Sequence, residues 1–430
     1  MKKRRTKAMD QTQTKKLNTS KKVDSRSLWL IALCWLVYTC SYIGKLGYNA
    51  NVTQIETLYG VSHAEAGTVS TFFFFAYGAG QIVNGLFCKK YNLRFVVFGS
   101  LLLSALMNIL VGFASSFAVL KFLWLVNGGA LSVLWTALIR LLAETLTEER
   151  RKTAVIVMGT TVATGTFLTY GMSALFVALG NFQTIFFVAG GLLPVVAVVW
   201  LFFYPHLTQK EEFAEKESVE TEATQATDKK SGLQGLWIAL IIMAVFAVTD
   251  NLVKDGLTTW VPSILKETYA LPDYVSILLT LFLPVLAIFG ATVAVVLQKK
   301  IKSFVLICAV LFLTAAALIG AVIGFLPTGA VAVTLISFAL VSCLMSGVNN
   351  VITSIVPMFW KDKINSGLLA GVLNGFCYLG STVSAYGLGA AADAWGWLTT
   401  FWLLFALCAG CAIVGIVFSI LKKGKGETEA

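Results

Sequence analysis

Two lysines lie inside apolar segments that are long enough to cross a membrane. Lys45 occurs in YTCSYIGKLGYNAN and Lys254 in VTDNLVKDGLTTWVP. A charged side chain at the centre of a membrane-spanning helix costs about 2.5 to 3.5 kcal/mol, so it needs a partner or a function. Two ammonium groups that face the same aqueous space repel each other until an anion lies between them. The pair therefore predicts a binding site for an anion.

A purely structural explanation of the two lysines is the alternative. Lys254 can pair with Asp250, one helical turn away, or lie near Asp255, while Lys45 can extend to interfacial water. Asp250 also has two functional explanations. Its carboxylate either neutralises Lys254 until a substrate arrives or carries a proton.

Polar side chains at helical spacing are candidates for the rest of the site. Tyr42 lies close to Lys45 in the sequence, and Asn374, Tyr378 and Ser381 follow one another at i, i+4 and i+7. Residues at this spacing share one face of a helix. Hydrogen bonding between helices is the alternative for the uncharged side chains. The predicted substrate-binding residues are Lys45, Lys254, Tyr42, Asp250, Asn374 and Tyr378.

The residue patterns that carry catalysis or hold metal ions do not occur in this sequence. Its two histidines, His63 and His206, both stand at the edges of apolar segments. There is no cluster of carboxylates, nucleophile motif or phosphate-binding loop. Cys408 and Cys411 form a CxxC pair inside an apolar segment, with no histidine nearby to complete a metal site. We therefore predict that the protein is not an enzyme and has no catalytic residue, metal or cofactor.

The composition indicates how these residues are positioned. Of the 430 residues, 57% are hydrophobic and 13% are charged, whereas soluble domains have about 25% charged residues. Apolar segments of about 20 residues, the length that crosses a bilayer as a helix, recur along the chain. The predicted spans are 28–48, 64–87, 95–114, 120–142, 154–179, 184–204, 236–260, 274–297, 304–326, 330–360, 367–392 and 398–421.

The net charge of +11 comes from basic residues in particular places, which argues against a nucleic-acid partner. Ten lie in the first 26 residues, and the others in loops cluster in alternate connections, the pattern of cytoplasmic loops. We therefore expect a multi-pass protein of the cell membrane with both termini in the cytoplasm. The basic tail is expected to be disordered and attracted to anionic lipid. The loop clusters are Lys89, Lys90 and Arg94; Arg150, Arg151 and Lys152; Lys299, Lys300 and Lys302; Lys361 and Lys363; and Lys422, Lys423 and Lys425.

A polar segment divides the chain into two halves. QKEEFAEKESVETEATQATDKK cannot cover an apolar core and is typical of a solvated linker. Shifting the first half by 209 residues places Lys45 on Lys254, which suggests a parallel duplication. We predict an all-α membrane protein with 12 transmembrane helices in two six-helix bundles. Its predicted parts are a basic cytoplasmic tail (1–27), an N-terminal bundle (28–204), a cytoplasmic linker (205–235), a C-terminal bundle (236–421) and a second tail (422–430).

Several separated motifs resemble the organophosphate:phosphate antiporter family of the major facilitator superfamily, which includes glycerol-3-phosphate and hexose-phosphate transporters. The segment AYGAGQIVNGLFCKKYNLR (76–94) is similar to that family's second helix and following loop. KDGLTTWVPSILKE (254–267) is similar to its seventh helix, and AGVLNGFCYLGSTVSAYGLGAAADAWGW (370–397) to its eleventh. The residues that match the loop motif and the end of the fourth helix are Gly85, Lys90, Asn92, Arg94, Trp135, Arg140 and Arg151.

This resemblance implies a major facilitator fold and a substrate site. Lys45 and Lys254 occupy the positions of the family's two substrate-binding arginines. Lysine is a point charge and lacks the planar fork of arginine. A carboxylate or another organic anion would therefore suit the pair as well as a phosphate ester. Further departures are Gln81, Val162 and Lys89 at positions where members have Lys, His and an acidic residue.

The implied function is secondary active transport of a small organic anion by alternating access. Exchange against inorganic phosphate or another anion is the expected mode, and we expect a monomer surrounded by membrane lipids. One alternative is a proton-coupled symporter that uses Asp250. Another is a transporter-like sensor that binds the anion without moving it, because the family includes such receptors.

Overall fold

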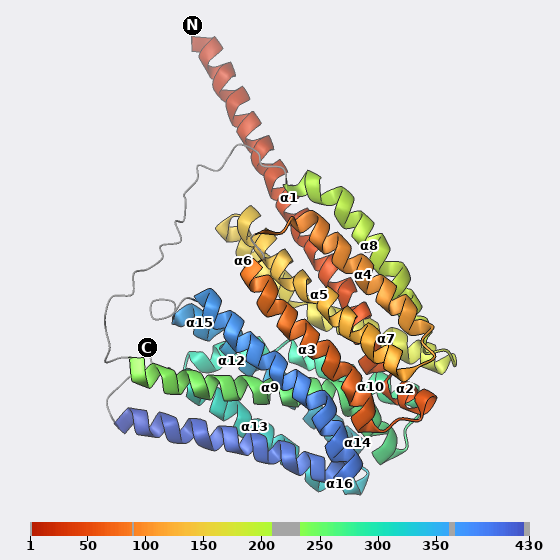
Figure 1. Ribbon diagram of the computed structural model, residues 1–430. Helices are drawn as coiled ribbons and strands as arrows, with labels where there is room; N and C mark the ends of the chain where they lie inside the picture. Colours follow the sequence, from red (N-terminus) through yellow and green to blue (C-terminus); the bar gives the residue numbers. More distant parts are fainter. Residues whose placement is uncertain (1, 88–89, 209–232, 361–365, 425–430) are drawn as a thin grey trace.

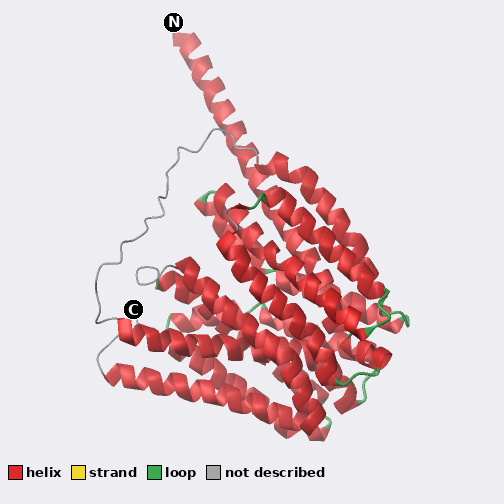
Figure 2. Cartoon of the chain, viewed as in Figure 1, coloured by secondary structure: helices red, strands yellow, loops and turns green. Residues whose placement is uncertain are grey.

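The computed structural model is built of helices throughout the residues that it describes, 2–87, 90–208, 233–360 and 366–424, which contain no strand (Figure 2). Apolar surroundings explain this uniformity, because backbone groups in a bilayer must be hydrogen-bonded within their own segment. Ten helices in this part of the chain are long and apolar enough to cross a membrane. The prediction of an all-α membrane protein is confirmed.

The described residues of the first half form eight helices, which Figure 1 shows as one bundle, coloured from red to yellow-green. They are α1 (Lys2–Ala50), α2 (Val52–Tyr59), α3 (His63–Phe87), α4 (Leu93–Gly112), α5 (Phe117–Thr145), α6 (Glu148–Gly159), α7 (Thr161–Ala178) and α8 (Thr184–Thr208).

The second half forms the other bundle. Its elements are α9 (Leu233–Tyr269), α10 (Asp273–Thr280), α11 (Phe282–Ala287), α12 (Gly290–Gln298), α13 (Phe304–Phe325), η2 (Leu326–Thr328), α14 (Val331–Asn350), the π-helical turn η3 (Val351–Ile355), α15 (Val356–Phe359) and α16 (Ser366–Gly424).

The last helix, α16, contains two of the predicted spans. Gly396 has φ of 76° inside it, a left-handed conformation that glycine adopts without a steric penalty. The predicted connection between the eleventh and twelfth spans is therefore a sharp turn at one glycine. The ten qualifying helices count α16 once and do not include the 25-residue α3, so the number of 12 stays a prediction.

The basic tail differs from its prediction. Disorder was expected for residues 1–27, but α1 continues back to Lys2 as one helix of 49 residues (Figure 1). The segment from Lys2 to Ile43 contains neither glycine nor proline. A helix that forms in the membrane can therefore propagate into it without meeting a helix-breaking residue.

Some predictions concern parts of the chain outside the described residues. Most of the predicted linker is one of these, because α8 ends at Thr208 and α9 begins at Leu233. The basic residues Lys89, Lys361, Lys363 and Lys425 also lie outside the described ranges.

The two bundles meet mainly along α3 and α16, and also where α7 packs against α10. Two glycines of α3 allow this close crossing: a Cβ atom on Gly67 would collide with the backbone of Ala385, and one on Gly78 with the side chain of Tyr378. Figure 1 shows the bundles converging near α2 and spreading apart toward the ends of the helices that carry the two termini. We call these two ends the first-loop end and the terminal end.

Candidate functional site

Lys45 is enclosed by tyrosine rings from three helices. Its side chain in α1 is buried, with 8% of the residue exposed, so it does not extend to interfacial water. Its Nζ lies 4.3 Å from the ring centroid of Tyr77, 5.0 Å from Tyr42 and 5.9 Å from Tyr378. Cations within about 6 Å of a ring face are attracted by its electrons. Because Tyr77 is on α3 and Tyr378 is on α16, both bundles contribute to this enclosure.

Lys254 is held by an amide instead of a carboxylate. Its Nζ donates a hydrogen bond of 3.1 Å to Oδ1 of Asn251, one turn earlier on α9. The same oxygen accepts a bond of 3.1 Å from Nδ2 of Asn349. In the described part of the chain, neither Lys254 nor Lys45 lies within ion-pairing distance of a carboxylate. The predicted pairing of Lys254 with Asp250 is therefore not a direct ion pair.

The two lysines come from opposite bundles and lie near enough to interact. Lys254 repels the ammonium group of Lys45, and Asp255 attracts both of them. Figure 1 shows α1 and α9, the helices that carry these lysines, in different bundles. We call Lys45, Lys254, Asp255 and the rings of Tyr42, Tyr77 and Tyr378 the lysine site.

Two carboxylates stand close to Lys254 in different surroundings. Asp250 is fully buried; its Oδ2 accepts a 3.1 Å bond from Asn349, and its Oδ1 has no hydrogen-bond partner. Asp255 is only partly buried, and its Oδ2 accepts a 2.5 Å bond from Oγ of Ser381 on α16. A buried carboxylate oxygen without a partner is costly, so Asp250 is suited to holding a proton.

The remaining predicted substrate residues connect the bundles. Asn374 on α16 donates a 2.6 Å bond from Nδ2 to Oε1 of Gln81 on α3. Tyr378 packs on Tyr77 with ring centroids 5.0 Å apart. Contact of these side chains with a substrate stays a prediction.

The loop-motif residues lie apart from the lysine site, at the terminal end. Oδ1 of Asn92 accepts a 3.1 Å bond from the backbone N–H of Arg94 at the start of α4. The Arg94 guanidinium donates to the carbonyl of Leu201, with distances of 3.2 Å and 3.0 Å, which joins α4 to α8. Arg140 pairs with Glu144 at 2.7 Å. The other four predicted motif residues are Gly85 in α3, Lys90 with its Nζ 5.4 Å from the Phe87 ring, Trp135 in α5 with its ring 4.8 Å from that of Tyr38, and the exposed Arg151 in α6.

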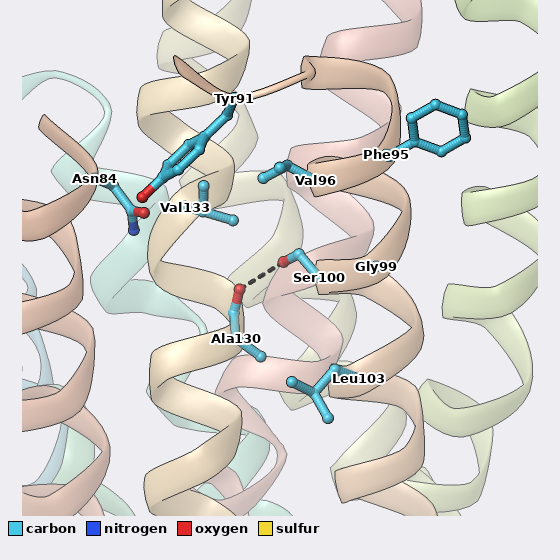
Figure 3. A pocket seen from close by; sticks show the side chains of 9 residues that line it. All are labelled: Asn84, Tyr91, Phe95, Val96, Gly99, Ser100, Leu103, Ala130 and Val133. Carbon is cyan, nitrogen blue, oxygen red and sulfur yellow. Dashed lines mark hydrogen bonds between the residues drawn. The ribbon is translucent and has the colours of Figure 1, made fainter. Parts of the chain in front are cut away.

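A cavity of about 310 Å³ lies beside this motif, and it does not include the lysine site. Figure 3 shows its lining from α3, α4, α5 and the loop before α4, with Ser100 Oγ donating a 2.6 Å bond to the carbonyl of Ala130. Phe95 points outward, away from the other lining side chains in this view. The lining residues are Asn84, Tyr91, Phe95, Val96, Gly99, Ser100, Leu103, Ala130 and Val133.

Three residues in or beside the lysine site were not predicted from the sequence. Tyr38 lies on the face of α1 that carries Tyr42, with ring centroids 5.5 Å apart, and the i, i+4 spacing could have revealed it. Tyr77 and Asn251 carry no such signal, because their contacts depend on how α3 and α9 pack.

A second polar cluster connects the bundles at the first-loop end. Nδ1 of His63 lies 2.8 Å from Oε1 of Glu56, and Nε2 lies 3.1 Å from Oε1 of Glu267 in the other bundle. The Asp393 carboxylate accepts the backbone N–H of His63 at 3.2 Å and that of Ala64 at 2.7 Å. We call His63, Glu56, Glu267 and Asp393 the first-loop bridge.

The charge of His63 follows from these contacts. Burial by itself lowers the pKa of His63, but its hydrogen bonds to Glu267 and Glu56 outweigh burial and raise the pKa to about 10. Burial raises the pKa of Glu56. The donor atoms of Glu56, His63 and Glu267 lie within 4.8 Å of one another, a spacing that a metal ion could use. Each carboxylate, however, is bonded to a different ring nitrogen, which favours an imidazolium bridge.

Two helical bundles with charged residues buried where they meet form the architecture of secondary transporters. Residues 34–366 match the Major Facilitator Superfamily, and the chain belongs to this superfamily.

Two curated proteins are similar to part of this chain. The membrane sensor protein UhpC of Escherichia coli (strain K12) is 29% identical over 98 residues, which cover 23% of this chain and 22% of that protein. UhpC of Salmonella typhimurium is 26% identical over 98 residues, with the same shares. Each match therefore spans about a fifth of the relative's length.

Solved structures resemble nearly the whole chain. A bacterial homologue of the human lysosomal transporter Spinster, in an inward-facing and unoccupied conformation, has a TM-score of 0.71 and 14% identity, covering 92% of this chain and 95% of that one. The nucleoside transporter NupG has a TM-score of 0.64 and 14% identity, covering 91% and 98%. At these identities the likeness concerns the fold.

Proposed function

We propose that this protein is a secondary transporter that carries a small organic anion across the membrane by alternating access, in exchange for inorganic phosphate or another anion. The observation that carries the proposal is that the buried Lys45 and the partly buried Lys254 come from opposite bundles and lie close enough to repel each other. An anion between them would relieve this repulsion. Such a ligand would also draw the two bundles together, as alternating access requires.

The arrangement of the bundles supports one conformation of this cycle. Hydrogen bonds join the bundles close to the first-loop end, including Asn49 Nδ2 to Thr259 Oγ1 at 2.8 Å and Tyr170 Oη to the carbonyl of Thr258 at 2.8 Å. The positive-inside pattern places the terminal end in the cytoplasm. We therefore propose that the structure is an inward-facing state of the cell-membrane protein, closed at the first-loop end, with both termini in the cytoplasm.

Exchange of labelled phosphate in proteoliposomes tests the proposal, with external phosphate, a phosphate ester or a dicarboxylate as the counter-substrate. Lys45→Ala and Lys254→Ala should each lower exchange by roughly tenfold or more, since each removes a charge that contacts the anion. Lys266→Ala is the matched control, because Lys266 pairs with Asp273 at 2.8 Å outside the lysine site. Unaltered exchange in both lysine variants would exclude the proposed site.

Proton-coupled symport is a second candidate, favoured by the unpartnered oxygen of Asp250. In a symporter, an inward proton gradient should drive net uptake of the anion. Asp250→Asn should abolish uptake driven by the proton gradient, because asparagine keeps the shape of the side chain but cannot bind and release a proton. Anion exchange at equal pH on both sides should stay intact. Gradient-driven uptake that survives in Asp250→Asn would exclude Asp250 as the proton carrier.

An anion sensor is the third candidate, favoured by the similarity to the membrane sensor protein UhpC. A sensor would show a saturable thermal shift with phosphate or a phosphate ester but no movement of either into proteoliposomes. Measured exchange of the anion that binds would exclude a function in sensing alone.

A further inference from the structure

Asp255 is a charged residue of the lysine site to which neither lysine is ion-paired. It follows Lys254 on α9, and its Oδ2 accepts a hydrogen bond from Ser381 on α16. Oγ of Ser381 also accepts a 3.1 Å bond from Nδ2 of Asn251. Ser381, which Asn251 holds in turn, therefore fixes the position of the Asp255 carboxylate.

Asp255 interacts electrostatically with both lysines of the site. It attracts Lys45 from the other bundle and Lys254 beside it. Its negative charge also interacts with the hydroxyl groups of Tyr42 and Tyr378, two of the tyrosines that surround Lys45. The carboxylate is therefore a third charge in the place where an anion would bind.

A simple anion does not complement this set of three charges. An anion held by Lys45 and Lys254 brings negative charge toward Asp255, and like charges in a site of low dielectric repel strongly. A hydrogen-bond donor on the ligand would remove this repulsion. An ammonium group does so best, because it supplies both the donor and the opposite charge.

We infer that the lysine site takes a zwitterion, a small molecule with a phosphate or carboxylate group for Lys45 and Lys254 and an ammonium group for Asp255. This inference rests on the proposed function and specifies the class of its substrate. The anionic group lies between the lysines, and the ammonium group donates to the Asp255 carboxylate. Asp250 is not part of this contact, because it is fully buried and its Oδ2 already accepts a bond from Asn349.

Matched pairs of probes test the inference on the purified full-length protein. Phosphoethanolamine and ethyl phosphate differ only in the ammonium group, as do β-alanine and propionate. The ammonium-bearing member of at least one pair should bind about tenfold more tightly or better, the effect of one charged hydrogen bond. Asp255→Asn should remove this preference by weakening the zwitterion and strengthening the simple anion.

Two control variants make the result specific. Asp255→Glu keeps the charge and should keep the preference. Asp273→Asn removes a carboxylate that pairs with Lys266 outside the site, and should also keep it. Equal binding within both pairs, or a preference unchanged in Asp255→Asn, would overturn the inference and leave anion transport standing. Failure of all four probes to bind, with no exchange of any anion, would overturn both.

Discussion

His63 joins the two bundles through its two ring nitrogens, with Nε2 lying 3.1 Å from Oε1 of Glu267 and Nδ1 lying 2.8 Å from Oε1 of Glu56. The rings of Trp260 and Trp397 pack beside the imidazole at centroid distances of 5.5 Å and 5.4 Å. Because Glu56 is on α2 and Glu267 is on α9, the first-loop end can open only when the contact with Glu267 breaks.

Glu267→Gln should shift the protein toward a state that is open at the first-loop end. The substitution removes the charge that His63 contacts, and the expected loss is only about 1 kcal/mol because the Glu267 side chain is 40% exposed. Spin labels at the exposed positions Leu58 and Trp395 should report a larger population of long distances. Glu144→Gln removes a carboxylate from a pair at the terminal end and should leave the distances unaltered.

The contacts of His63 that close the first-loop end should weaken at alkaline pH. His63 has a pKa of about 10 in this structure, above its ordinary value of 6.5. A raised pKa means that the charged form stabilises the closed state, fully below about pH 6.5 and less as the pH rises through about 10. The groups that face His63 are Glu56, Glu267 and Asp393.

Distances between the same spin labels, recorded from pH 6.5 to 10.5, measure this dependence. The open population should increase toward the upper limit in the parent protein. His63→Asn should show no such increase, because asparagine cannot carry the proton. A pH profile shared by the parent and His63→Asn would assign the effect to another group.

Tyr77→Leu should impair anion exchange through Lys45. The Tyr77 ring is nearer to the Lys45 ammonium than the other tyrosines are. The loss of one cation–π contact should lower the rate of exchange by about 2-fold to 30-fold. Tyr77→Phe keeps the ring and should retain most of the activity. Tyr91→Leu alters a tyrosine that lines the separate cavity of Figure 3 and serves as the control.

Gly67→Ala should destabilise the folded protein, whereas Gly99→Ala should not. A Cβ atom at Gly67 would collide with the carbonyl of Ala385, while one at Gly99 would meet no other atom. Overpacking of this kind costs about 1 to 3 kcal/mol. Thermal unfolding in detergent should show a lower midpoint for Gly67→Ala. Equal midpoints for the two variants would mean that α3 and α16 can move apart without loss of stability.

The sequence by itself determined the helices and the two unusual lysines. Apolar segments of about 20 residues must form helices in a bilayer, whatever they pack against, because only a helix satisfies their backbone groups locally. Lys45 and Lys254 stood out for the same local reason, since a charge in such a segment is costly wherever the helix lies. The helical tail before Ser25 and the single-residue turn at Gly396 were not predicted, since neither leaves an apolar pattern.

Only the tertiary structure decided which residues meet. Tyr77 encloses Lys45, Ser381 bonds Asp255, and Glu267 bonds His63, although 204 residues separate the last two in the sequence. These contacts depend on the packing of α3 and α16 and on the relative position of the bundles. Helical periodicity describes one helix at a time, so it contains no information about a partner on another helix.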